Sequence, residues 1–119
     1  MRALAARTHS EPAARDAPAL KVIVRRWASK IGVEPKRVHV QRMTTKWASC
    51  SLSGRLCFSS DLLLEDAAFQ EAVIVHELLH LRVPNHGKLF RSLMAAYAPG
   101  WEGAGVLRIS ERCGRGRQG

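Results

Sequence analysis

Residues 73–81 read VIVHELLHL, an almost wholly apolar stretch that carries two histidines and one glutamate. It lies within a longer segment, from about Asp66 to Arg82, that contains neither glycine nor proline and is apolar on more than one side. A helix that is apolar nearly all round is a central, buried one. The sequence therefore predicts a buried helix here, which Pro84 ends.

The polar residues of this helix follow the pattern HExxH. His76 and His80 are four residues apart, so both imidazoles lie on one helical face and can bind one metal ion at about 2.0–2.1 Å. Glu77 is rotated by about 100° from His76, given roughly 3.6 residues per turn, so it flanks the ion and is predicted to act as a general base. His86 is the leading candidate for a third ligand, which would leave one position open for water. A lone buried histidine is ordinarily a hydrogen-bonded core residue, but this combination predicts a zinc site.

Besides a β-hairpin, one helix and one strand are predicted upstream of the buried helix, and one helix is predicted downstream. Apolar residues recur at helical spacing over residues 20–31, and Gly32 is placed to end that helix. Residues 37–43 alternate polar and apolar side chains, as a half-buried strand does. Residues 85–98 predict a further helix, because their apolar side chains share one face.

Residues 47–51 and 55–59 are predicted to form a β-hairpin around residues 53–54, since glycine tolerates the positive φ of a two-residue turn. In that register Cys50 faces Cys57 directly. We expect the two thiols to stay reduced, because directly opposed strand positions usually strain a disulfide.

The order of elements is helix, strand, hairpin and then helices, which predicts an α+β domain with a small antiparallel sheet packed against the buried helix. The 119 residues are enough for one domain with one core. We assign residues 1–18 to a flexible N-terminal arm, residues 19–110 to the folded domain and residues 111–119 to a flexible basic tail.

The composition, 46% hydrophobic and 24% charged, is that of a globular protein and excludes a collagen-like or disordered chain. No apolar run approaches the about 20 residues of a transmembrane helix, and no apolar core of a signal peptide is visible. We therefore expect no membrane partner and a cytoplasmic location. The net charge of +9 is concentrated in residues 20–60 and 81–119, which are either solvated faces or surfaces that attract nucleic acid.

Three segments, in order, resemble motifs of the YgjP-like metallopeptidase-like domain, a relative of the SprT and WLM zincins. Residues 42–51, RMTTKWASCS, are similar to the family's Arg-…-Trp-Gly-Ser-Cys-Ser segment. Residues 73–81 resemble its zinc helix, and residues 85–90 resemble its Asn-His-Ser/Gly-…-Phe segment.

The resemblance implies a minimal zincin-like domain over residues 19–110, in which the cofactor zinc is held by His76, His80 and His86 and Glu77 is catalytic. The function expected is that of a zinc-dependent hydrolase of the metallopeptidase type. Metal-activated water would attack a peptide carbonyl, so a peptide or protein is the expected substrate.

Arg42, Lys46 and Trp47 are predicted to line the substrate cleft, where an edge strand can pair with an extended peptide. The alternatives are a solvated face for the two cations and a core contact with Phe58 for Trp47. Two other functions remain open. One is a metal-dependent hydrolase of nucleotide phosphoanhydrides, and the other is a nucleic-acid-associated module with structural zinc that docks phosphate on residues 20–60.

Overall fold

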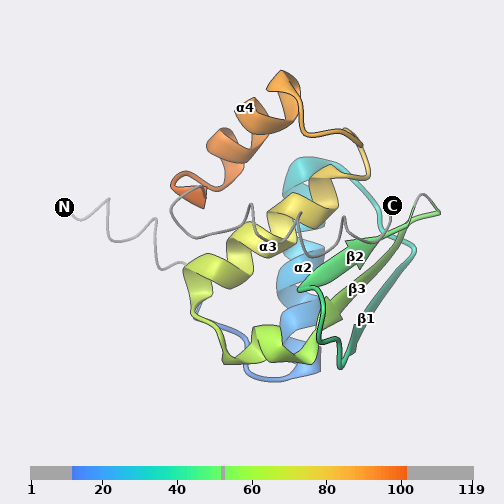
Figure 1. Ribbon diagram of the computed structural model, residues 1–119, viewed down its shortest axis with the longest axis vertical. Helices are drawn as coiled ribbons and strands as arrows, with labels where there is room; N and C mark the ends of the chain where they lie inside the picture. Colours follow the sequence, from blue (N-terminus) through green and yellow to red (C-terminus); the bar gives the residue numbers. More distant parts are fainter. Residues whose placement is uncertain (1–11, 52, 102–119) are drawn as a thin grey trace.

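The structure is a computed structural model that describes residues 12–51 and 53–101. A central helix contacts a three-stranded sheet and two further helices, the first of which also contacts the sheet (Figure 1). In chain order the elements are α2 (Ala17–Ile31), β1 (Arg37–Gln41), β2 (Ala48–Cys50), β3 (Arg55–Ser59), the 3-10 helix η1 (Ser60–Leu64), α3 (Ala67–Leu79) and α4 (Lys88–Tyr97).

Helix α2 begins and ends at residues that suit its termini. The side chain of Asp16 accepts a hydrogen bond from the N–H of Ala19 at the N-terminus. Gly32 follows the last turn with a φ of 86°, a left-handed conformation that glycine adopts without a steric penalty. The predicted end of this helix is therefore confirmed, and its start lies three residues before the expected residue 20.

The segment ahead of α2 is packed against α3. Ala14 is buried, its N–H donates to Oε1 of Gln70 (2.7 Å), and its carbonyl accepts from Nε2 of Gln70 (2.8 Å). The expectation of a flexible arm over residues 1–18 is therefore wrong for its last part, because these contacts hold the backbone in the core. Residues 1–11 and the expected basic tail, residues 111–119, lie outside the described residues.

The sheet has the strand order β1-β3-β2, with β3 in the centre. Strand β2 pairs with β3 antiparallel, whereas β1 pairs with β3 parallel. The predicted α+β class is confirmed, but the sheet is mixed rather than wholly antiparallel. Residues 42–47 lead from β1 to β2, which lies two strand positions away in the sheet. Strand β3 then forms between β1 and β2, so it is parallel to β1 and antiparallel to β2.

The hairpin between β2 and β3 has a longer turn than predicted. The N–H of Ser51 donates to the carbonyl of Arg55 (3.0 Å), and the N–H of Gly54 donates to the carbonyl of Ser51 (3.0 Å). Three residues therefore separate the paired positions instead of two. Gly54 has a φ of 98°, which glycine tolerates.

This turn shifts the register by one residue. Cys50 pairs with Leu56, and Cys57 pairs with Ser49. The prediction that Cys50 faces Cys57 is wrong, since a one-residue slip moves a side chain to the other face of the sheet. Both cysteines are free, and Cys50 lies on the core side of the sheet with Leu56.

Helix α3 is the buried helix that the sequence predicts. Its residues 72–79 are all buried, and Asp66 caps its N-terminus by accepting a hydrogen bond from the N–H of Phe69 (2.8 Å). The helix ends at Leu79 rather than Arg82, because the backbone continues as a hydrogen-bonded turn.

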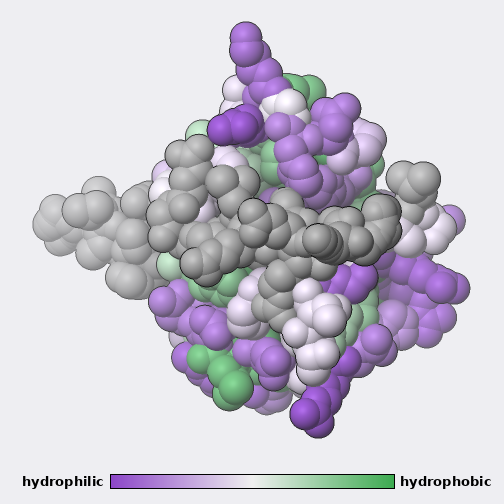
Figure 2. Space-filling model, viewed as in Figure 1, coloured by the Kyte–Doolittle hydropathy of each residue, from purple (hydrophilic) through white to green (hydrophobic). Residues whose placement is uncertain are grey.

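Helix α4 packs across the end of α3 and buries Phe90 and Met94. It begins at Lys88, three residues after the expected start. On the face shown in Figure 2, hydrophilic residues lie over both the sheet and α4. Within the described residues, no helix is long and apolar enough to cross a membrane.

Candidate metal centre

Three histidines meet at the C-terminal end of α3. His76 lies in the last turn of this helix, His80 follows its last residue, and His86 lies in the segment before α4. One ligand nitrogen from each lies within 4.8 Å of the other two. His76 is buried and His86 is exposed, so the cluster reaches from the core to the surface.

The turn after α3 brings His86 back towards His80. Three successive N–H groups of this turn donate to carbonyls of the last helical turn: those of His80, Leu81 and Arg82 to Glu77, Leu78 and Leu79. Nη1 of Arg82 also donates to the carbonyl of Ile31 (3.0 Å), which ties the turn to the end of α2. The Nε2 atoms of His80 and His86 are then 3.0 Å apart.

This arrangement could hold a metal ion. Nitrogens bound to tetrahedral zinc at about 2.0–2.1 Å lie about 3.3 Å from each other. The 3.0 Å between Nε2 of His80 and Nε2 of His86 is close to that spacing. Three imidazoles are also a donor set of catalytic zinc sites, which keep a fourth position open.

The protonation of the histidines favours metal binding. Burial lowers the pKa of His80, outweighing the negative charge of Glu77 and the backbone hydrogen bonds of Val83 and Pro84, which raise it. Burial and the neighbouring imidazoles lower the pKa of His86 to about 4. Both side chains are therefore neutral at neutral pH, and the neutral imidazole is the form that binds a metal.

Glu77 is buried beside the histidines. Burial alone would raise the pKa of its carboxyl, but the hydrogen bond with Nδ1 of His76 (3.2 Å) and the electrostatic effect of the three nearby histidines lower it more. The pKa of Glu77 therefore lies below its ordinary value, and the side chain is a carboxylate at neutral pH. A buried carboxylate next to metal-binding groups is able to accept a proton.

Cys50 is a neighbour of this site that the sequence does not reveal. Burial and the negative charge of Glu77 raise the pKa of its thiol to about 12. Cys50 lies on β2, which contacts α3, and its thiol stays protonated at neutral pH. The side of the sheet on which Cys50 lies depends on the hairpin register, and the register predicted from the sequence was wrong.

The structure does not bring Arg42, Lys46 and Trp47 to the histidine cluster. Trp47 packs edge-on against Phe69 (5.1 Å between ring centroids), about two helical turns before His76. Lys46 is half-buried and lowers the pKa of the Cys57 thiol, although burial raises that pKa more. Arg42 is exposed beyond the end of β1.

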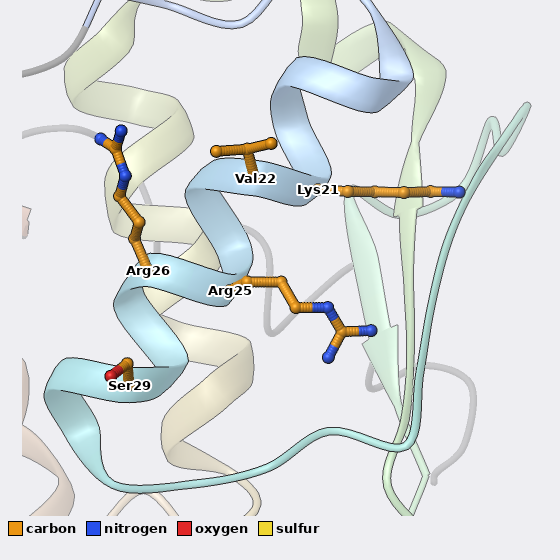
Figure 3. A pocket seen from close by; sticks show the side chains of 5 residues that line it. All are labelled: Lys21, Val22, Arg25, Arg26 and Ser29. Atoms are coloured by element: carbon orange, nitrogen blue, oxygen red, sulfur yellow. The ribbon is translucent and has the colours of Figure 1, made fainter.

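A separate hollow of about 530 Å³ lies on the outer face of α2. Its lining is strongly basic and consists of Lys21, Val22, Arg25, Arg26 and Ser29. Lys21 and Arg25 extend towards the sheet, whereas Arg26 projects the other way (Figure 3). None of the three histidines lines it.

The fold and the histidine cluster together define a small metallopeptidase-type domain. Residues 5–105 match the family model described as the YgjP-like metallopeptidase domain. The chain belongs to this family, as the resemblance of its motifs implied.

The fold is also similar to a solved structure, described as the crystal structure of the metallopeptidase zymogen of Methanocaldococcus jannaschii jannalysin. The TM-score is 0.66, the sequences are 22% identical, and the similarity covers 79% of this chain and 97% of that one. No curated protein matches the chain.

Proposed function

We propose that the chain is a zinc-dependent peptidase in which His76, His80 and His86 hold one zinc ion and Glu77 is the general base. The observation that carries this proposal is the convergence of three histidine side chains beside a buried carboxylate. Membership of a metallopeptidase family supports the peptide bond as the target.

A zinc ion held by His76, His80 and His86 would supply Lewis-acid chemistry, which would make water more acidic and polarise a carbonyl group. Glu77 takes a proton from the attacking water and returns it to the leaving amine. The hydrogen bond with His76 keeps Glu77 charged before that step. The surrounding buried residues of α3 exclude bulk water from this carboxylate.

Strand β2 is the element that we assign to substrate binding, since it is an edge strand that contacts α3. Trp47 and Ser51 use their backbone groups to pair with β3. In an antiparallel pair the intervening Cys50 directs its backbone N–H and C=O to the opposite side, where an extended peptide can add as a further strand.

Such a peptide would run from the histidine cluster, near Cys50, towards Trp47. Three residues of extended chain span about 10 Å at roughly 3.3 Å per residue. Trp47 and Lys46 would then contact the substrate a few residues from the bond that is cut. Arg42 would contact it only further out.

The test is an activity screen of the zinc-loaded chain against casein, single-stranded DNA and nucleoside triphosphates. We expect casein to be cut and the nucleotides to stay intact. Hydrolysis of nucleoside triphosphates without casein cleavage would contradict the peptidase assignment and would support the phosphoanhydride alternative. Elemental analysis of protein purified without chelators should give one zinc per chain.

The basic hollow on α2 favours a second candidate function, in which the chain associates with nucleic acid. Lys21, Arg25 and Arg26 line this hollow without a carboxylate among the lining residues, and the first two extend in the same direction (Figure 3). Binding through phosphate contacts weakens steeply as salt rises. DNA affinity that is strong at low salt and is lost in the variant Lys21→Glu/Arg25→Glu would support this candidate, and affinity equal in both proteins would exclude the hollow as the binding surface.

A further inference from the structure

Phe90 lies in the first turn of α4, four residues after His86, and is only 1% exposed. Its ring contacts the imidazoles of all three histidines. The centroid distances are 5.3 Å to His76, 5.0 Å to His80 and 4.8 Å to His86. Phe90 is therefore the common neighbour of the candidate zinc ligands.

The three contacts differ in geometry. The Phe90 ring is stacked on His80, with 21° between the planes, and meets His76 and His86 nearly edge-on, at 82° and 83°. Edge-to-face and stacked contacts at these centroid distances are the favoured arrangements of aromatic rings. One ring thus contacts a face or an edge of each imidazole.

Such contacts matter because the χ2 angle of histidine has a broad, soft energy profile. Rotation of an imidazole about this bond moves its ligand nitrogen away from the ion. A buried ring packed against all three imidazoles restricts that rotation before any metal is present. The imidazoles are then ordered when the chain folds, so ordering them no longer reduces the free energy of metal binding.

We propose that Phe90 is a positioning residue, which holds the three imidazoles in the arrangement that binds zinc. The proposal rests on the metal site of the proposed function and adds a residue that does not touch the metal. Phe90 also covers the inner side of the cluster with an apolar surface, which keeps competing water away from the ligands.

The experiment compares Phe90→Leu with the parent chain. Leucine keeps an apolar side chain but removes the ring. We measure zinc affinity by competition with a chromogenic chelator, and we record the visible absorption spectrum of the cobalt(II)-loaded protein, which reports ligand geometry. Loss of a neighbour that orients metal ligands typically weakens metal binding by about 10–100-fold, and we expect Phe90→Leu to fall in this range with an altered cobalt spectrum.

Two further variants separate positioning from general packing. Met94→Leu alters a buried residue one turn further along α4, so it disturbs the same helix without removing a ring from the histidines. We expect it to leave zinc affinity and the cobalt spectrum unchanged. Phe90→Tyr keeps the ring, and we expect it to retain the spectrum of the parent.

A folded Phe90→Leu with the zinc affinity and cobalt spectrum of the parent would overturn the role of Phe90 and leave the metal site intact. A parent chain that binds neither metal would overturn both. If Phe90→Leu does not fold, Phe90→Met replaces it in the same comparison, because a flexible thioether adapts to irregular space.

Discussion

Glu77 is the residue with the most direct chemical consequence. It is buried, charged at neutral pH and hydrogen-bonded to Nδ1 of His76, and the proposed zinc site needs it only as a base. The residues around it therefore fix its protonation state, while its place beside His76 in the helix fixes its position.

We expect Glu77→Gln to keep its zinc and to lose about 10²–10⁴-fold in the rate of casein hydrolysis, because the amide cannot take a proton. Elemental analysis and a rate assay at neutral pH check this. Glu34→Gln, at an exposed position, is the matched control and should be fully active. Full turnover by a zinc-loaded Glu77→Gln would exclude the proposed mechanism.

The histidine pKa values predict how the stability of the metal-free chain depends on pH. Burial lowers the pKa of His86 from 6.5 to about 4, so the unfolded chain binds this proton more readily than the folded one. The contribution of His86 to the free energy of unfolding is therefore fully present above pH 6.5 and is lost as the pH falls towards about 4. His80 shifts in the same direction.

We expect the free energy of unfolding of the metal-free chain to fall between pH 7 and pH 5, measured by urea titration with a chelator present. His86→Asn removes one titrating group and should show a smaller fall. An equal fall in both proteins would mean that His86 does not carry this dependence.

At the scale of elements, the side chain of Gln70 on α3 forms hydrogen bonds with two other segments of the chain. Its side chain accepts from the N–H of Ala14 and donates to the carbonyls of Ala14 and Leu62, all within 2.9 Å. Nothing in the sequence pattern marks this residue except that it is a polar residue in an apolar helix.

We expect Gln70→Ala to destabilise the chain by about 2–4 kcal/mol, because it removes the hydrogen-bond partner of the buried N–H and carbonyl of Ala14 and one of the two bonds to the carbonyl of Leu62. Chemical denaturation measures the change. Gln41→Ala, at an exposed position at the end of β1, should change the free energy of unfolding by less than about 0.5 kcal/mol. Zinc content should be unchanged in both variants.

The elements differ in how far the sequence predicted them. The buried helix, the end of α2 at Gly32 and the histidine cluster followed from local periodicity and spacing. The parallel pairing of β1 with β3 could not be predicted from local periodicity, since it depends on where residues 42–47 cross the sheet. The hairpin register depended on one extra turn residue, and that error hid the position of Cys50 beside Glu77.

At the scale of the whole molecule, the buried core includes residues of the candidate metal centre, His76 and Glu77. Helix α3 supplies His76, the carboxylate and much of the buried apolar surface, and His80 follows directly after its last residue. A metal held by α3 and by the segment before α4 would link the two helices that lie against each other.

Zinc should therefore stabilise the chain as a whole. A ligand that binds only the folded state contributes about 2.7 kcal/mol at a free concentration 100 times its Kd. We expect removal of zinc with a chelator to lower the Tm and re-addition to restore it. His80→Ala should not respond to zinc, whereas His39→Ala, exposed on β1, should respond like the parent; an identical Tm with and without zinc would contradict the site.

The position of β3 in the middle of the sheet has a consequence for synthesis on the ribosome. Strands β1 and β2 leave the ribosome first, and neither pairs with the other, since both pair with β3. The nascent chain therefore carries two strands without their partner until residue 59 has been made. Helix α3 and His86 follow β3 in the sequence, so the sheet can be completed only shortly before the residues of the histidine cluster are made.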